Sequence, residues 1–315
     1  MSMGEPTAEG VGVSFITVSE DEAGQRIDNF LVTRLKGLPK SRLYRLLRKG
    51  EVRVNKGRIK PEYRLEAGDS IRLPPMRVSE SKEVAAPGAA MRSRLEGGVL
   101  YENDELLVID KPAGLAVHGG SGVSLGLIEA LRATRPGETL ELVHRLDRGT
   151  SGCLLVAKKR SALRALQGQL RSHQVDKVYL ALVDGNWPKG LDVMDAPLNK
   201  VAAPSGENFV RVSKDGKRAL TRFKVRKRFP GMTLLEVTLE TGRTHQIRVH
   251  CQLAGHPLLG DDKYGSDARN LEMRGRGLRR IFLHAHRLCF QSPASGETLC
   301  VESPLPCELR EIIGE

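Results

Sequence analysis

A stretch without apolar periodicity, residues 76–98, divides this 315-residue chain into two parts of different texture. The stretch carries Ser, Glu, Arg and an Ala-Ala-Pro-Gly run, which is the composition of a flexible linker. Because 40% of all residues are hydrophobic, each part has the material for a core of its own. The sequence therefore predicts a small domain at residues 19–75 and a larger one at residues 99–315, after a disordered tail at residues 1–18.

The smaller part carries most of the positive charge. Residues 26–72 contain fourteen Lys or Arg against five Asp or Glu, a net +9 out of +12 for the whole chain. Such an excess indicates a polyanionic partner, either nucleic acid or an acidic membrane surface. No apolar run reaches the length of a bilayer span, and no basic start leads into an apolar core. We therefore expect a cytoplasmic protein that binds nucleic acid and not a membrane.

Two short helices are predicted within this basic part. Ile27, Phe30 and Leu31 have the i, i+3, i+4 spacing of an amphipathic helix. A second helix is expected to begin with Ser41 as its N-cap and to end at Gly50. Alternating valines at 52 and 54 then predict a half-buried strand.

The second of these helices has a basic face. Arg42, Arg45 and Lys49 stand at i, i+3 and i+7, on the side opposite the leucines. This pattern predicts a surface that contacts RNA phosphates. The alternative is an ordinary solvated helix face, since charged runs are common on protein surfaces.

The larger part has the mixed texture of an α+β domain. Apolar strands are expected near residues 106–109, 154–157, 178–183, 234–239 and 281–290. A helix with Ser161 as its cap is expected to end at Arg171, and another to run from Thr244 to Gly255. Strands mixed irregularly with few helices favour α+β over a regular βαβ array.

Cysteines and histidines do not form a recognisable metal or disulfide pattern. The five cysteines are odd in number and form no CxxC pair, so neither a disulfide framework nor a cysteine-rich zinc site is expected. The histidine pairs lack a carboxylate at ligand spacing, which argues against a metal. A Gly-rich phosphate loop, a GxSxG elbow and the HxE…PCxxC deaminase signature are also missing.

The densest group of polar residues is His-Arg-Leu-Asp-Arg-Gly-Thr-Ser-Gly at 144–152. Asp147 lies between two arginines, which favour its ionised form, as a nucleophile or base requires. Gly149 and Gly152 allow tight backbone geometry beside it. From these residues alone, a charged structural loop is the better interpretation, because such loops are common.

The order of several motifs is more specific than any of them alone. The motifs are His144-Arg145-Leu146-Asp147-Arg148, Asp110-Lys111-Pro112-Ala113-Gly114, Lys177-Val178-Tyr179-Leu180-Ala181, Gly242-Arg243-Thr244-His245-Gln246-Ile247-Arg248-Val249-His250, Gly255-His256-Pro257 and Gly260-Asp261…Tyr264-Gly265. Together they resemble the motifs of the pseudouridine synthases of the ribosomal large subunit class, and residues 25–74 resemble the S-four RNA-binding domain that many of these enzymes carry. One departure is Gly149, where an acidic residue is more usual in the family. The resemblance implies a catalytic domain with a mixed, largely antiparallel sheet and flanking helices.

The same resemblance assigns roles to five residues. Asp147 matches the catalytic aspartate, Tyr179 the tyrosine that stacks on the target base, and Arg248 the arginine that pairs with the aspartate. Ile247 would form an apolar wall beside the base, and Arg145 would fill the space left by the extruded nucleotide. Whether Asp147 attacks C1′ or C6, or removes a proton from C2′, is left open.

The implied reaction is the isomerisation of uridine to pseudouridine in 23S ribosomal RNA. It changes neither mass nor redox state, so no cofactor and no metal are expected. The expected partner is 23S RNA or the assembling large subunit, and the expected state is a monomer. The alternative function is a non-catalytic RNA-binding assembly factor with the same two domains. A carboxylate in an RNA groove argues against that alternative. It repels phosphate, so a protein that only binds RNA would have no need of it.

Overall fold

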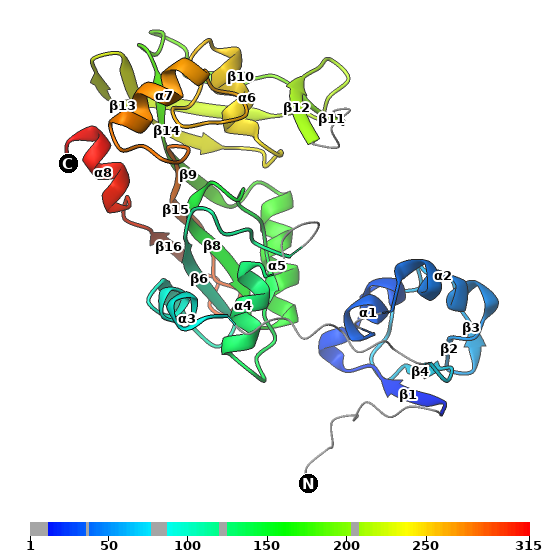
Figure 1. The fold of residues 1–315 in the computed structure, drawn as a ribbon. Coiled ribbons are helices and arrows are strands. Elements are labelled where there is room, and N and C mark those ends of the chain that lie inside the picture. Colours follow the sequence, from blue (N-terminus) through cyan, green and yellow to red (C-terminus); the bar gives the residue numbers. More distant parts are fainter. Residues whose placement is uncertain (1–11, 36–37, 77–86, 120–124, 203–207) are drawn as a thin grey trace. The chain divides into compact units, whose positions relative to one another are not determined.

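The structure, a computed structural model, describes residues 12–35, 38–76, 87–119, 125–202 and 208–315. The chain divides into an N-terminal unit, residues 1–86, and a C-terminal unit, residues 87–315 (Figure 1). Each unit has its own hydrophobic core. No helix among these described residues combines the length and apolarity that crossing a bilayer would require.

The N-terminal unit packs two helices against a small antiparallel sheet with strand order β1-β4-β2-β3. Its core consists of apolar residues from both helices and from the strands. The elements are β1 (Ser14–Thr17), a 3-10 turn (Glu20–Glu22), α1 (Ile27–Arg34), α2 (Lys40–Lys49), β2 (Arg53–Val54), β3 (Gly57–Arg58) and β4 (Ser70–Leu73).

Both predicted helices of this unit are confirmed, but one predicted cap is wrong. Helix α2 begins at Lys40 with Pro39 as its N-cap, because the Pro39 carbonyl accepts from the N–H groups of Arg42 and Leu43. Ser41 therefore lies inside the first turn. The helix ends, as predicted, at Gly50, whose φ of 68° is favourable for glycine.

The boundaries predicted for the tail and the linker are partly wrong. Residues 14–17 form β1, which pairs with β4 along its full length, so the predicted tail does not extend to residue 18. Residues 89–96 of the predicted linker form α3 (Ala89–Glu96), whose Leu95 is buried in the C-terminal core. Residues 1–11 of the tail and 77–86 of the linker lie outside the described residues.

The C-terminal unit is an α+β domain built on a ten-stranded sheet, which confirms the predicted fold class. Its helices are α3, α4 (Leu127–Thr134), α5 (Arg160–Arg171), α6 (Gln246–Leu253), α7 (Asp267–Gly275) and α8 (Cys307–Ile313). Its strands are β5 (Val99–Glu102), β6 (Leu106–Lys111), β7 (Glu141–Leu142), β8 (Ser151–Ala157), β9 (Asp176–Asp184), β10 (Val193–Asp195), β11 (Leu198–Ala202), β12 (Asn208–Val212), β13 (Leu220–Phe229), β14 (Met232–Leu239), β15 (Leu283–Gln291) and β16 (Thr298–Glu302).

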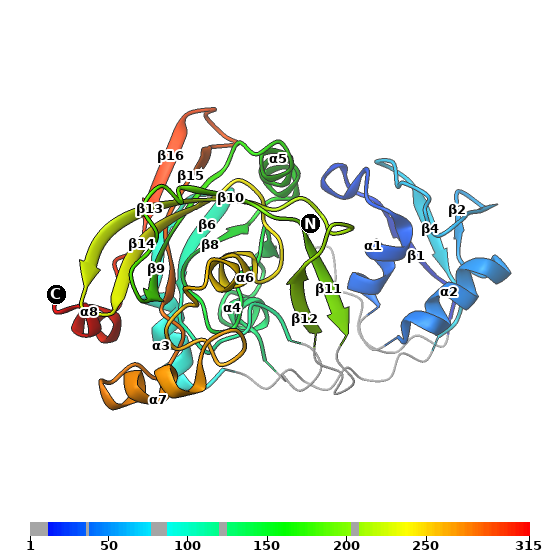
Figure 2. The ribbon, with the colours of Figure 1, turned by 90° about the horizontal axis from the view of Figure 1, so that it is seen from above.

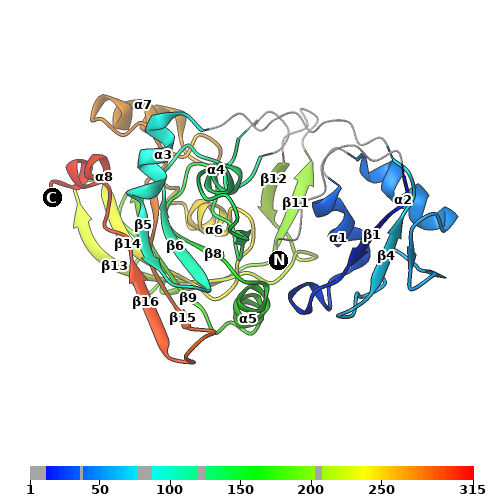
Figure 3. The ribbon, with the colours of Figure 1, turned by 90° about the horizontal axis from the view of Figure 1, so that it is seen from below.

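The main sheet has the order β10-β13-β14-β9-β15-β8-β6-β5, and β7 and β16 pair with β8 and β15. Alternation along the strands sends apolar side chains to both faces. One face packs against α3, α4 and α6, and the other against α5, α7 and α8. Figure 3 shows α4 and α6 on one side of the sheet and α5 on the other.

Helix α5 begins at Arg160 after Lys159, so the predicted cap at Ser161 is wrong.

One pairing inside this sheet is parallel. Strand β15 pairs with β8 through Ser151 and Gly152, whereas its pairings with β9 and β16 are antiparallel. Gly152 has a φ of 107°, and a Cβ placed there would lie 2.2 Å from the Ala285 carbonyl oxygen. Only glycine fits this close approach, which holds the start of β8 against β15.

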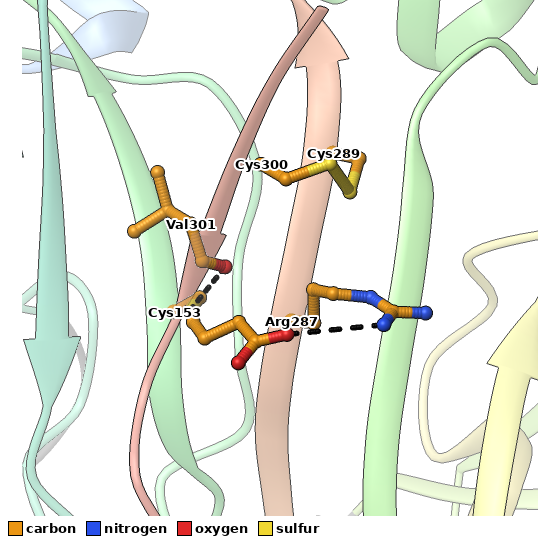
Figure 4. Close-up of a disulfide and its surroundings, with 6 residues drawn as sticks. Cys153, Arg287, Cys289, Cys300 and Val301 are labelled. Carbon is orange, nitrogen blue, oxygen red and sulfur yellow. Dashed lines mark hydrogen bonds and ion pairs between the residues drawn. A yellow bond between two sulfur atoms is a disulfide. The ribbon is translucent and has the colours of Figure 1, made fainter.

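A disulfide joins β15 to β16. Cys289 and Cys300 stand opposite each other in the ladder and are bonded (Figure 4). The sequence predicted no disulfide framework. The structure corrects this prediction at one place, where this local bond joins two neighbouring strands. Nearby, the Cys153 thiol contacts the Val301 carbonyl, and burial raises the pKa of that thiol to about 12, so it stays protonated.

Candidate active site

A cavity of about 520 Å³ opens in the C-terminal unit. Its walls come from the loop before β8, the end of α5, strand β9 and the loop that leads into α6. All five residues that the sequence assigned to this site line it: Arg145, Asp147, Tyr179, Ile247 and Arg248. Side chains separated by about a hundred positions in the sequence are thus brought to one place.

The loop that carries Asp147 is fixed by a buried lysine. The Lys111 ammonium is fully buried and donates to the carbonyls of Pro112 and Leu115 at 2.9 Å and of Arg148 at 3.3 Å. Burial, together with the charge of Arg280, lowers the pKa of Lys111 to about 7. Lys111 is the last residue of β6, and its hydrogen bond to Arg148 therefore connects the residue next to Asp147 to the end of this strand.

Arg248 is placed by a second carboxylate. Its Nε and Nη2 donate to the two oxygens of Asp261 at 2.7 and 2.6 Å, a bidentate pair with a fully buried carboxylate. Burial lowers the pKa of Arg248, but hydrogen bonds to Asp261 and its charge outweigh this and raise it. The Arg248 Nη1 lies 4.0 Å from Asp147 Oδ2. The predicted pairing with Asp147 is thus a longer contact, and Asp261 is the direct partner.

His245 also faces Asp147. It caps α6 in the left-handed conformation, with φ of 54°. Its Nε2 lies 3.9 Å from Asp147 Oδ2, and its Nδ1 is 2.8 Å from the Tyr264 hydroxyl. Burial lowers the pKa of His245 although Asp147 raises it, so the ring is neutral at physiological pH.

Tyr179 and Ile247 provide the apolar part of the cavity. Tyr179 lies on β9 and Ile247 on the first turn of α6, and both belong to the same core cluster. Their exposed fractions are 7% and 4%. Burial, and then the nearby Asp147 carboxylate, raise the pKa of the Tyr179 hydroxyl, so it stays protonated at neutral pH.

The cations predicted to contact RNA have exposed side chains. Arg145 is exposed at the cavity, next to the loop of Asp147. On α2 in the N-terminal unit, Arg42, Arg45 and Lys49 are exposed while the leucines of the helix are buried. The predicted two-faced character of α2 is confirmed, and its contact with RNA stays a prediction.

Sequence reasoning missed three residues of the site. Asp261, His245 and Tyr264 all stand in motifs that were recognised, but their contacts with Arg248 and Asp147 depend on how distant segments fold together. The guanidinium of Arg248 also lies over the Tyr264 ring, 4.9 Å from its centre. The signal that could have found Asp261 was its place in the motif Gly260-Asp261…Tyr264-Gly265.

Comparison with known proteins identifies the class. The family model described as RNA pseudouridylate synthase matches residues 105–253, and the S4 domain model matches residues 25–71. The chain belongs to the RNA pseudouridine synthase family and carries an S4 domain in front of the catalytic domain.

Individual relatives are similar over nearly the whole chain. "Ribosomal large subunit pseudouridine synthase C" of Pasteurella multocida (strain Pm70) is 57% identical over 305 residues, 96% of this chain and 93% of the relative. The protein of the same name from Escherichia coli (strain K12) is 56% identical over 301 residues, 94% of each chain. The solved structure titled "Human RNA Pseudouridylate Synthase Domain Containing 4" has a TM-score of 0.60 at 27% identity and covers 71% of this chain and 95% of that chain.

Proposed function

We propose that this enzyme isomerises specific uridines to pseudouridine in large-subunit (23S) ribosomal RNA, with Asp147 as its catalytic carboxylate. The observation that carries the proposal is the cavity itself. A half-buried aspartate faces a buried tyrosine, an isoleucine and a fixed arginine there. The relatives named above point to the large subunit as the source of the substrate.

The reaction needs no external reactant. The N1–C1′ bond of uridine breaks, a C5–C1′ bond forms, C5 gives up its proton and N1 gains one. Atoms and electrons balance within the substrate, so side chains alone suffice. Asp147 acts at the face of the nucleoside where the bond to the sugar is exchanged, and the Arg248 Nη1 lies 4.0 Å from its Oδ2.

The target base fits between the Tyr179 ring and Ile247. A freed uracil that turns within the cavity needs a flat apolar surface on which to slide, and an aromatic ring provides one. A uridine in a folded RNA reaches this cavity only after extrusion from its stack. Arg145, exposed beside Asp147, is the side chain that would enter the space it leaves.

The N-terminal unit supplies affinity rather than chemistry in this proposal. Arg42, Arg45 and Lys49 on α2 would pair with phosphates of 23S RNA or of the assembling subunit. The enzyme would act as a monomer in the cytoplasm, where that RNA is made and assembled. The role of α2 rests on its exposed basic face and on the match to an S4 domain.

The decisive test is Asp147→Asn, with pseudouridine mapped in a 23S RNA transcript. The swap is nearly isosteric, so RNA affinity should persist while turnover falls by about 10⁴-fold or more, as when other catalytic aspartates are amidated. Asp262→Asn is the matched control, because Asp262 is exposed and pairs with Arg274. Measurable turnover by the Asp147→Asn variant would remove Asp147 from its role. Binding without turnover by the wild type would favour the non-catalytic assembly factor.

A further inference from the structure

A two-stranded hairpin, β11–β12, stands apart from the main sheet and packs beside α6 (Figure 2). Its inner side chains, Leu198 and Val210, join Val249 of α6 and Tyr264 in one small core. The Val210 N–H also donates to the Tyr264 hydroxyl at 3.0 Å. The hairpin therefore packs against Tyr264, whose hydroxyl is 2.8 Å from His245 of the cavity wall.

Phe209 lies on the outer side of this hairpin. Its side chain is 37% exposed, although its neighbour Val210 is buried. The Lys263 ammonium stands over the ring, 4.1 Å from its centre. An exposed aromatic ring with a cation beside it is unusual as core packing, but it is the composition of a site that stacks a base and pairs its phosphate.

Three rings lead from Asp147 to this hairpin. His245 faces Asp147, its ring centre is 5.5 Å from that of Tyr264, and Tyr264 is 6.3 Å from Phe209. Each ring meets the next close to edge-on, at 72° and 80°. Phe209 is thus two ring contacts away from His245, which lines the cavity.

The charge of this region suits a polyanion. Residues 198–218 contain five Lys or Arg and two Asp or Glu. Arg211 stands two positions from Phe209 on the same exposed side of β12 and pairs in register with Asn199. A negatively charged strand with flat bases therefore matches this face in both shape and charge.

We infer that Phe209 and Lys263 form a nucleotide-stacking site, in which a base that flanks the target uridine stacks on the Phe209 ring and its phosphate pairs with Lys263. The inference rests on the proposed function, because it places the strand whose uridine enters the cavity. Phe209 binds but does not touch the reacting atoms. Its loss should therefore weaken capture of the strand and leave the chemical step intact.

The test compares Phe209→Ala with Val212→Ala in the full chain. Val212 lies on the same strand with the same exposed fraction of 37%, but it alternates to the other side of the hairpin. Affinity for a 23S RNA transcript is measured by filter binding, and turnover at saturating RNA by pseudouridine mapping. Phe209→Ala should weaken binding about tenfold with unchanged saturated turnover, since stacking of one base is lost. Val212→Ala should change neither the affinity nor the saturated turnover. Phe209→Trp keeps an aromatic ring, so it should bind RNA like the wild type.

Lys263 gives a second, independent measurement. Lys263→Gln should reduce the slope of log K against log salt by about 0.7, and Phe209→Ala should leave that slope unchanged. Equal affinities of Phe209→Ala and Val212→Ala would overturn the inference, as would a wild type that binds no RNA. A wild type that binds RNA through Phe209 but forms no pseudouridine would instead refute only the proposed function.

Discussion

The two units place their charges in opposite ways. On α2 the cations are exposed, and in the N-terminal core the buried Asp28 pairs with Arg26, whose side chain is 40% exposed. Arg248, which lines the catalytic cavity, pairs with Asp261, and their side chains are only 14% and 0% exposed. Exposed charges attract RNA and are screened by salt, whereas a buried pair fixes geometry and is costly to break.

Under the proposed function, this difference separates capture of the substrate from its conversion. The N-terminal unit would contribute long-range attraction that any polyanion would feel. The C-terminal unit contributes a carboxylate whose neighbours Lys111, His245 and Arg248 each have a hydrogen-bond partner of their own. The following predictions test whether the two kinds of charge respond as differently as their surroundings suggest.

The largest loss of stability is expected for Asp261→Ala. It leaves the Arg248 guanidinium buried without its partner and removes the acceptor for the N–H groups of Lys263 and Tyr264. The free energy of unfolding, measured with urea, should fall by about 3–5 kcal/mol. Glu240→Ala, which breaks an exposed pair with Arg222, should cost less than about 1 kcal/mol. Similar costs for both variants would show that the buried pair is not special.

Acid should destabilise the catalytic unit before the N-terminal unit. Burial lowers the pKa of His284 from 6.5 to about 4, so the unfolded chain takes up its proton first. Stability from this group is full above pH 6.5 and is lost as the pH falls toward 4, by about 3 kcal/mol. The N-terminal unit contains no histidine, and its Asp28, whose pKa the Arg26 hydrogen bond lowers from 3.8, loses stability only at lower pH.

A pair of histidine variants isolates that effect. His284→Gln should reduce the pH dependence of unfolding between 6.5 and 4, and His144, whose pKa burial also lowers to about 4, accounts for part of what remains. His173→Gln should not, because His173 has an exposed side chain. If both variants keep the wild-type slope, the charge of His284 does not control acid unfolding.

Binding of the target base should respond to salt differently from binding of the phosphates. Tyr179→Leu removes the ring and should weaken RNA affinity by roughly 1–3 kcal/mol at every salt concentration. Tyr179→Phe keeps the ring, so its affinity should match the wild type, and any fall in turnover would report on the hydroxyl. The order Phe milder than Leu is the expected result, measured by binding titrations at several salt concentrations. Equal affinities would mean that Tyr179 does not stack on the base.

The smallest effect per residue is expected on α2. Replacing Arg42, Arg45 and Lys49 together with Ala should reduce the slope of log K against log salt by about 2, with saturated turnover unchanged. The control replaces three exposed cations of β13, Arg222, Lys224 and Arg226, two of which already pair with glutamates. A slope unchanged in the α2 variant would mean that this face contacts solvent and not RNA.

The sequence predicted the parts of this molecule that depend on local pattern. Helix α2 followed from its leucine spacing, and the basic face followed with it. The cap was misplaced because Ser41 has the better side chain, but the Pro39 carbonyl closes the first turn. Strand β1 was not predicted, because its apolar residues Phe15 and Ile16 are adjacent and do not alternate with polar ones. In the structure Phe15 is 67% exposed, so the strand buries little apolar surface.

The site was predictable only in part, for a related reason. Asp147 stood out between its two arginines, but only motif resemblance gave it and Tyr179 a role in the reaction. The direct partner of Arg248 depends on the segment at Leu258, which pairs with β9 and brings Asp261 back to α6. The Cys289–Cys300 bond likewise needed the register of β15 with β16, and no spacing in the sequence specifies that register.

The parallel contact of β15 with β8 also governs when activity can arise during synthesis. Ser151 and His284, which meet across it, are 133 residues apart, so chain-closure entropy delays this contact. The sheet of the N-terminal unit is complete once β4, which ends at Leu73, has emerged. A nascent chain is therefore expected to bind RNA early and to gain a finished cavity only when β15 arrives, near the end of translation. Attraction to RNA precedes catalysis in the life of each molecule as it does in each turnover.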